Sequence, residues 1–341
     1  MRIHGVSRLI LIVAFYSIVL HSQTHFATEN APRVPGQMVD VGGYRMHLYC
    51  VGKGSPTVIL ENGLGDIFSD WALVQPEVGK YTRVCSYDHA YEGYSDAGPV
   101  PVTMHQQVFE THLMLEKAKI SPPYIIAGHS FGGMLARLFT LTYPQEVVGL
   151  IFVDSTHEDL VLRNKGLKAM SNGKQVPPVQ TMKSGPPPPP TPEEESRFDE
   201  RKKRYEKEAE LPVGPPLDRL PPEALHLRAW AHAHPKILTG SESDPTVWMF
   251  TEVQHISDVE HSKPHPLGSM PIIVIGEPRD NPVSMEERRR QLDEMASLST
   301  NGKVVIDQNS GHHVQWDDPA FVLQAIRQVF DASKYGGELP K

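Results

Sequence analysis

Short runs of apolar residues recur along the chain, and between them apolar residues repeat at helical spacing. Continuous apolar runs bounded by turn residues are typical of buried strands, whereas a period of about 3.6 residues is typical of amphipathic helices. The runs lie at residues 56–61, 81–87, 124–127, 148–153, 270–276 and 303–306, and the helical pattern lies at residues 103–119, 134–142, 285–297 and 319–330. Strands that alternate with helices predict an α/β fold whose mostly parallel sheet is covered on both faces.

Two stretches depart from this alternation. Residues 37–50 are apolar on both sides of Gly42 and Gly43, which predicts an opening β-hairpin. Residues 156–267 lack a regular period and contain a proline run followed by a charged stretch with opposite charges at helical spacing. Because so long a segment between two strands is rarely a plain loop, it predicts an inserted cap. The predicted domains are a core at residues 31–155 and 268–335, with the cap at residues 156–267 between its two parts.

The strand at residues 124–127 runs directly into a G-x-S-x-G motif formed by Gly128, Ser130 and Gly132. A turn tight enough to join this strand to the following helix has no room for side chains on either side of the serine, hence the glycines. Such a turn lifts the hydroxyl to the tip of the sheet, at the positive end of the helix. The motif also occurs in ordinary glycine-rich turns, but the strand before it and the helix after it favour a nucleophile at Ser130.

Four motifs, in this order, resemble those of α/β hydrolases that carry a cap. They are residues 61–65 after the third strand, residues 87–96 after the fourth, the Ser130 motif, and Gly311-His312 after the last strand. The resemblance covers residues 34–330 apart from the cap. It implies an α/β-hydrolase fold: a mostly parallel eight-stranded sheet with helices on both faces and an inserted helical cap.

The resemblance also implies a catalytic triad. Ser130 would be the nucleophile and His312 its base, in the chain order that this fold uses, with His313 as the neighbouring alternative. The acid must hold the imidazole tautomer and stabilise the imidazolium. Asp280, after the strand at residues 270–276, is favoured for this role, and Asp154, at the end of the preceding strand, is the alternative.

The backbone N–H groups of Leu64 and Phe131 would form the oxyanion hole. Leu64 lies in the loop that resembles the family's His-Gly loop, with Asn62 where histidine is common, and Phe131 follows the nucleophile. Asp88 and Ser95 belong to a family motif that we interpret as fixing a turn.

This machinery is that of a serine hydrolase, which forms an acyl-enzyme and releases it with water. The expected substrate is a small carboxylic ester, or else an amide. The alternatives are a peptidase similar to proline iminopeptidases and a homologue that binds a ligand without catalysis. Serine at the elbow disfavours haloalkane dehalogenase and epoxide hydrolase chemistry, for which the family uses aspartate. The acyl and leaving groups and the oligomeric state stay open.

Composition narrows the class of protein further. The net charge of −8 disfavours a nucleic-acid partner. The sequence shows no metal-binding motif and no dinucleotide or phosphate loop, so we expect neither a metal nor another cofactor.

The first 30 residues resemble a targeting segment. Arg2 and Arg8 precede an apolar run at residues 9–20, which polar residues follow. This pattern predicts a signal peptide and an exported protein, either secreted or periplasmic, or else an uncleaved anchor as the one contact with a membrane.

The sequence contains two cysteines, Cys50 and Cys85. An even count allows one disulfide, and two buried thiols are the alternative. The resemblance to the α/β hydrolases places their strands side by side, which implies that a bridge can form.

Overall fold

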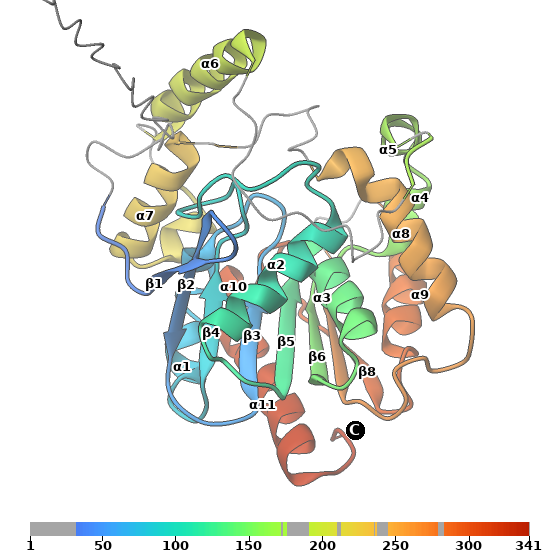
Figure 1. The fold of residues 1–341 in the computed structure, drawn as a ribbon. Helices are drawn as coiled ribbons and strands as arrows, with labels where there is room; N and C mark the ends of the chain where they lie inside the picture. Colours follow the sequence, from blue (N-terminus) through green and yellow to red (C-terminus); the bar gives the residue numbers. More distant parts are fainter. Residues whose placement is uncertain are drawn as a thin grey trace, which may run out of the picture. The chain divides into compact units, whose positions relative to one another are not determined.

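The computed structural model describes residues 32–171, 173–175, 191–209, 213–234, 236, 245–278 and 283–340. Within them, eight strands form one sheet in the order β1-β2-β4-β3-β5-β6-β7-β8 (Figure 1). β1 and β2 pair antiparallel, as do β2 and β4, and all other neighbours are parallel. The strands are β1 (Gln37–Asp40), β2 (Arg45–Val51), β3 (Thr57–Glu61), β4 (Val84–Tyr87), β5 (Tyr124–His129), β6 (Val147–Val153), β7 (Ile272–Gly276) and β8 (Gly302–Ile306). The predicted mostly parallel eight-stranded sheet is confirmed.

Helices cover both faces of this sheet (Figure 1). Those with residues in the core cluster on one face are α2 (Met104–Lys117), α3 (Phe131–Thr142), α4 (Glu158–Leu162), α8 (Thr246–Glu260) and α9 (Met285–Ala296). Those in the cluster on the other face are α1 (Gln75–Val78), α10 (Val314–Asp317) and α11 (Pro319–Tyr335), with the 3₁₀ helix η1 (Phe68–Trp71). In β5, Tyr124 and Ile126 enter the first cluster and Ile125 and Ala127 the second. Because successive strand residues point to opposite faces, the continuous apolar runs follow from burial on both sides.

Between β6 and β7 the described residues form mostly helices. These are α4 (Glu158–Leu162), α5 (Lys165–Met170), α6 (Pro192–Ala209), α7 (Pro222–Ala233) and α8, with the 3₁₀ helix η3 (Leu217–Arg219). α8 is anchored to the core by Glu252, whose buried carboxylate accepts hydrogen bonds from the backbone N–H groups of Met104 and His105 at 2.7 and 3.0 Å. The charged stretch is helical, as its pattern indicates. The division into core and cap domains stays a prediction, and the proline run lies outside the described residues.

A buried ion-pair cluster joins α3, α4 and α8. Arg137 of α3 donates to Glu158 of α4 at 2.8 Å and to Glu260 of α8 through both its Nε and its Nη2. All three side chains are nearly inaccessible to water. One guanidinium therefore balances two buried carboxylates and ties the segment after β6 to the elbow helix.

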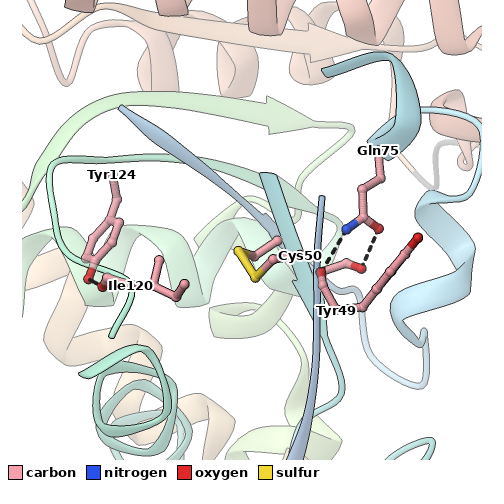
Figure 2. Close-up of a disulfide and its surroundings, with 7 residues drawn as sticks. Tyr49, Cys50, Gln75, Ile120 and Tyr124 are labelled. Carbon is pink, nitrogen blue, oxygen red and sulfur yellow. Dashed lines mark hydrogen bonds between the residues drawn. A yellow bond between two sulfur atoms is a disulfide. The ribbon is translucent and has the colours of Figure 1, made fainter. Parts of the chain in front are cut away.

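The two cysteines form a disulfide between β2 and β4. They face each other in the strand register, with their Cα atoms 4.1 Å apart. Figure 2 shows the bridge beside Gln75, whose Nε2 donates to the carbonyl of Tyr49 at 2.8 Å. The bridge that the strand order implies is therefore present.

Candidate active site

The turn between β5 and α3 holds Ser130 in a backbone conformation that side-chain-bearing residues rarely adopt. Its φ is 51° and its ψ is −121°, and such strain costs about 1–3 kcal/mol. A Cβ on Gly128 would lie 2.6 Å from the carbonyl oxygen of Gly132, and one on Gly132 would lie 2.4 Å from that of Asn62. Both glycines are thus required by close backbone approach, as the motif predicts.

His312 connects Ser130 to a carboxylate. It lies in the loop between β8 and α10, with its Nε2 at 3.0 Å from Ser130 Oγ and its Nδ1 at 2.6 Å from Asp154 Oδ2. A carboxylate only accepts, so Nδ1 carries the proton and donates to Asp154. Nε2 is then free to accept the hydrogen bond that the Ser130 hydroxyl donates. This is the geometry of a nucleophile, its base and an orienting acid.

Asp154 directly follows β6 and is held from two sides. Its Oδ2 accepts from His312, and its Oδ1 accepts from Nη2 of Arg288, a buried residue of α9. Its backbone N–H also donates to the carbonyl of Ile275 in β7 at 2.9 Å, and its φ of 39° is strained. Asp154 is the alternative acid that the sequence analysis names. Asp280, the favoured one, lies outside the described residues.

The pKa of His312 is raised from its ordinary value of 6.5. Partial burial opposes protonation of the ring, but the hydrogen bond to Asp154 and the negative charges of Asp154, Asp66 and Glu277 outweigh it.

Leu64 and Phe131 follow neighbouring strands. Glu61 of β3 pairs with Gly128 of β5, so each oxyanion candidate lies three residues beyond the paired position. Phe131 is the first residue of α3, where the helix leaves its N–H groups without helical acceptors. The loop that contains Leu64 lies close to the elbow, because a Cβ on Gly63 would be 3.2 Å from the Cβ of Ser130.

Asn62 and Asp88 hold the loops beside this site. Asn62 Nδ2 donates to the carbonyl of Tyr87, and its Oδ1 accepts from the indole of Trp71 at 3.0 Å. Asp88 accepts from the backbone N–H groups of Phe68 and Tyr94 at 2.7 and 2.9 Å. Asp88 therefore fixes the turn as its motif indicates.

Three further residues of the site had no distinctive sequence signal. His129 directly precedes Ser130 and is one of 17 histidines in the sequence. Asp66 and Arg288 stand in stretches whose patterns predict a loop and an amphipathic helix. The contacts of these three residues depend on segments far apart in the chain, which no local spacing reveals.

Two groups of described residues bring metal-ligand atoms within 4.8 Å of one another. They are Asp66, His129 and His313, and His157, Asp159 and Glu294. In the first group, His129 Nδ1 and Asp66 Oδ2 are 2.7 Å apart. That is a hydrogen-bond distance, whereas two ligands of a tetrahedral zinc ion lie roughly 3.3 Å apart. In the second group both carboxylates accept from Arg290. We therefore assign neither group to a metal.

Known proteins resemble parts of the chain. A protein of Saccharomyces cerevisiae (strain YJM789), named an uncharacterized vacuolar membrane protein, is 29% identical over 140 residues, or 36% of this chain and 22% of the relative. A protein of Gibberella zeae, named an AB hydrolase superfamily protein, is 34% identical over 115 residues, or 31% of this chain and 36% of the relative. The match thus spans well under half the length of each relative.

The yeast relative corrects the expected localisation. Its name places it at the vacuolar membrane, which contradicts the predicted export, and the signal peptide is not supported. A basic start followed by an apolar run does not by itself specify a destination, and residues 1–30 lie outside the described part of the chain. No helix within that part is long and apolar enough to cross a membrane.

The sequence of one segment and the fold both resemble those of α/β hydrolases. Residues 56–177 match the model of the alpha/beta hydrolase fold. The structure resembles that of an epoxide hydrolase without ligand (TM-score 0.60, 16% identity, covering 86% of this chain and 97% of the other). It also resembles a thermophilic esterase from Thermogutta terrifontis (TM-score 0.57, 18% identity, covering 87% and 99%). With its sheet order and its Ser130 elbow, the chain has the α/β-hydrolase fold, and its residues 56–177 resemble that family in sequence.

Proposed function

We propose that this protein is a serine hydrolase that cleaves carboxylic esters with Ser130, His312 and Asp154. The fold supports hydrolase activity. The observation that carries the proposal is the position of the His312 ring, 3.0 Å from the Ser130 hydroxyl and 2.6 Å from the Asp154 carboxylate.

The reaction follows from these positions. Ser130 Oγ attacks the carbonyl carbon of the ester while its proton passes to His312 Nε2. Asp154 stabilises the imidazolium, and the N–H groups of Phe131 and Leu64 stabilise the oxyanion. His312 then protonates the departing alcohol. Water, activated by the same nitrogen, attacks the acyl-enzyme and releases the acid.

The serine at the elbow supports an acyl-enzyme. Although the fold is shared with an epoxide hydrolase, the family opens epoxides with an aspartate at this position, so that chemistry is disfavoured here. An ester is the easiest substrate for this site to cleave, because an alcohol leaves a tetrahedral intermediate more readily than an amine does. An amide or a peptide is the second substrate class.

Ser130→Ala is expected to abolish covalent labelling by a fluorophosphonate probe, because the probe reacts only with an activated serine. Ser262→Ala, which changes an exposed serine after α8, is the matched control and is expected to label like the wild type. Gel fluorescence after labelling measures both. A wild type that does not react, or a Ser130→Ala variant that does, would contradict the proposal and favour a protein that binds without catalysis.

The hydrolysis of chromogenic esters is expected to slow as the pH falls through the pKa of His312. The base must be neutral to accept the proton of Ser130, and its pKa lies above the ordinary 6.5. The acid limb of kcat/KM, which reports the free enzyme, is therefore expected above pH 6.5. An acid limb at or below that value, with the fold intact by circular dichroism, would show that the Asp154 contact does not act on the base.

A further inference from the structure

His129, the residue before the nucleophile, is only 1% exposed, and both its ring nitrogens face oxygen acceptors. Nδ1 lies 2.7 Å from Oδ2 of Asp66, and Nε2 lies 3.0 Å from the backbone carbonyl oxygen of His312. A carbonyl oxygen only accepts, so Nε2 carries a proton and donates a hydrogen bond to the backbone carbonyl of His312. Nδ1 faces the carboxylate of Asp66, so both ring nitrogens are directed at oxygen acceptors.

These contacts join three separate segments of the site. Asp66 belongs to the loop after β3 that contains Leu64, His129 is the last residue of β5, and His312 lies in the loop after β8. Space between the first two segments is so small that a Cβ on Gly63 would lie 2.6 Å from Asp66 Oδ2 and 2.9 Å from His129 Nδ1. The oxyanion loop, the elbow and the base loop therefore meet at the His129 ring.

The far side of the base loop is also held. The His313 ring stacks on Trp316 with 3.8 Å between ring centroids and an angle of 11° between planes. The indole of Trp316 donates to the carbonyl of Asp70 at 2.8 Å. His313 also lies near the other oxygen of Asp66, at 3.7 Å. These contacts fix the position of His313. The hydrogen bond from His129 to the carbonyl oxygen of His312 then fixes the backbone of His312 itself.

We propose that His129 and Asp66 form a positioning pair that fixes the backbone of His312 and so sets its ring against Ser130. The inference rests on the proposed serine hydrolase function. Neither residue touches the reacting atoms: the pair acts through the geometry of His312. An error of about 1 Å in that geometry can lower the rate about 10²-fold.

Two substitutions at His129 separate the contact to His312 from the contact to Asp66. In His129→Gln the side-chain amide reaches the place of Nε2 and can still donate to the His312 carbonyl. In His129→Asn the shorter amide reaches only the place of Nδ1 and keeps the contact to Asp66 alone. The expected result is a kcat for His129→Asn about 10²-fold below wild type with KM within a few-fold, and rescue to within about tenfold in His129→Gln.

Asp66 provides a second pair of variants if His129→Asn does not fold. The amide of Asp66→Asn can donate to Nδ1 of a neutral His129, which keeps its Nε2 proton for the His312 carbonyl, whereas Asp66→Leu cannot. Asp66→Asn is therefore expected to retain more kcat than Asp66→Leu, by at least tenfold. Thermal unfolding confirms that the compared variants are folded.

Equal kcat values within each pair of folded variants would overturn the positioning role. The fluorophosphonate probe keeps that failure distinct from failure of the proposed function. If the wild type is labelled at Ser130 but kcat is equal within each pair of variants, the hydrolase proposal holds and the positioning role is wrong. A wild type without Ser130-dependent labelling overturns the hydrolase and the positioning pair with it.

Discussion

Asp154→Asn is expected to lower kcat by about 10⁴-fold with little change in KM. The amide oxygen of the asparagine would accept from Arg288. The NH₂ group of the asparagine would then point at Nδ1 of His312. That donor favours the tautomer with the proton on Nε2, the nitrogen that must accept from Ser130. The base is then in the wrong form although the geometry is retained. Steady-state kinetics with a chromogenic ester measures the loss.

Asp280→Asn is the matched control, because Asp280 is the other carboxylate that the sequence offers for the same role. It is expected to keep kcat within a few-fold of wild type. If Asp280→Asn instead shows the large loss while Asp154→Asn stays active, the acid is Asp280. If both stay active, neither aspartate orients His312.

Arg137→Met is expected to destabilise the protein by about 3–5 kcal/mol, because it leaves Glu158 and Glu260 as two buried carboxylates without a cation. Burial alone would raise the pKa of Glu158, but Arg137 outweighs it and lowers this pKa to about 2. In the wild type this pairing stabilises the fold above the ordinary pKa of 4.5 and ceases to do so as the pH falls through the lowered value. The difference between the two proteins is therefore expected to be largest above pH 4.5.

Urea denaturation at several pH values measures this effect. Arg163→Met is the control, since Arg163 pairs with Asp159 and Glu287 while its side chain is 64% exposed. Exposed pairs contribute about 0–1 kcal/mol. An Arg137→Met variant no less stable than Arg163→Met would show that the buried cluster contributes little to the fold.

The parts of the fold that were predicted correctly are those with local signals. Each core strand after the hairpin is apolar on both faces, so its run is visible in the sequence, and the helices between them keep one apolar stripe. The elbow was identifiable because its glycines are required where the backbone passes close to itself. Gly128 lies against Gly132 in the same turn, and Gly132 lies against Asn62 after the neighbouring strand.

The rest of the site depends on which segments meet. Asp154 and Asp280 both follow core strands, so their positions in the sequence could not show which carboxylate reaches His312. In the structure, Asp154 contacts His312 and the buried Arg288, whereas Asp280 lies outside the described residues. His129 shows the same limit: in sequence it is one histidine of 17, and only the folded chain places a carbonyl 183 residues away at its Nε2.

With Asp154 as the acid, nucleophile and acid stand at the ends of adjacent strands, β5 and β6, and both precede the long insertion. Only the base arrives from beyond it. The loop directly after β7 then supplies no residue of the triad, whereas α9, later in the same connection, supplies Arg288 to hold Asp154. During evolution that loop and the insertion can diverge to suit new substrates, while the pair on β5 and β6 is inherited as one short block of sequence.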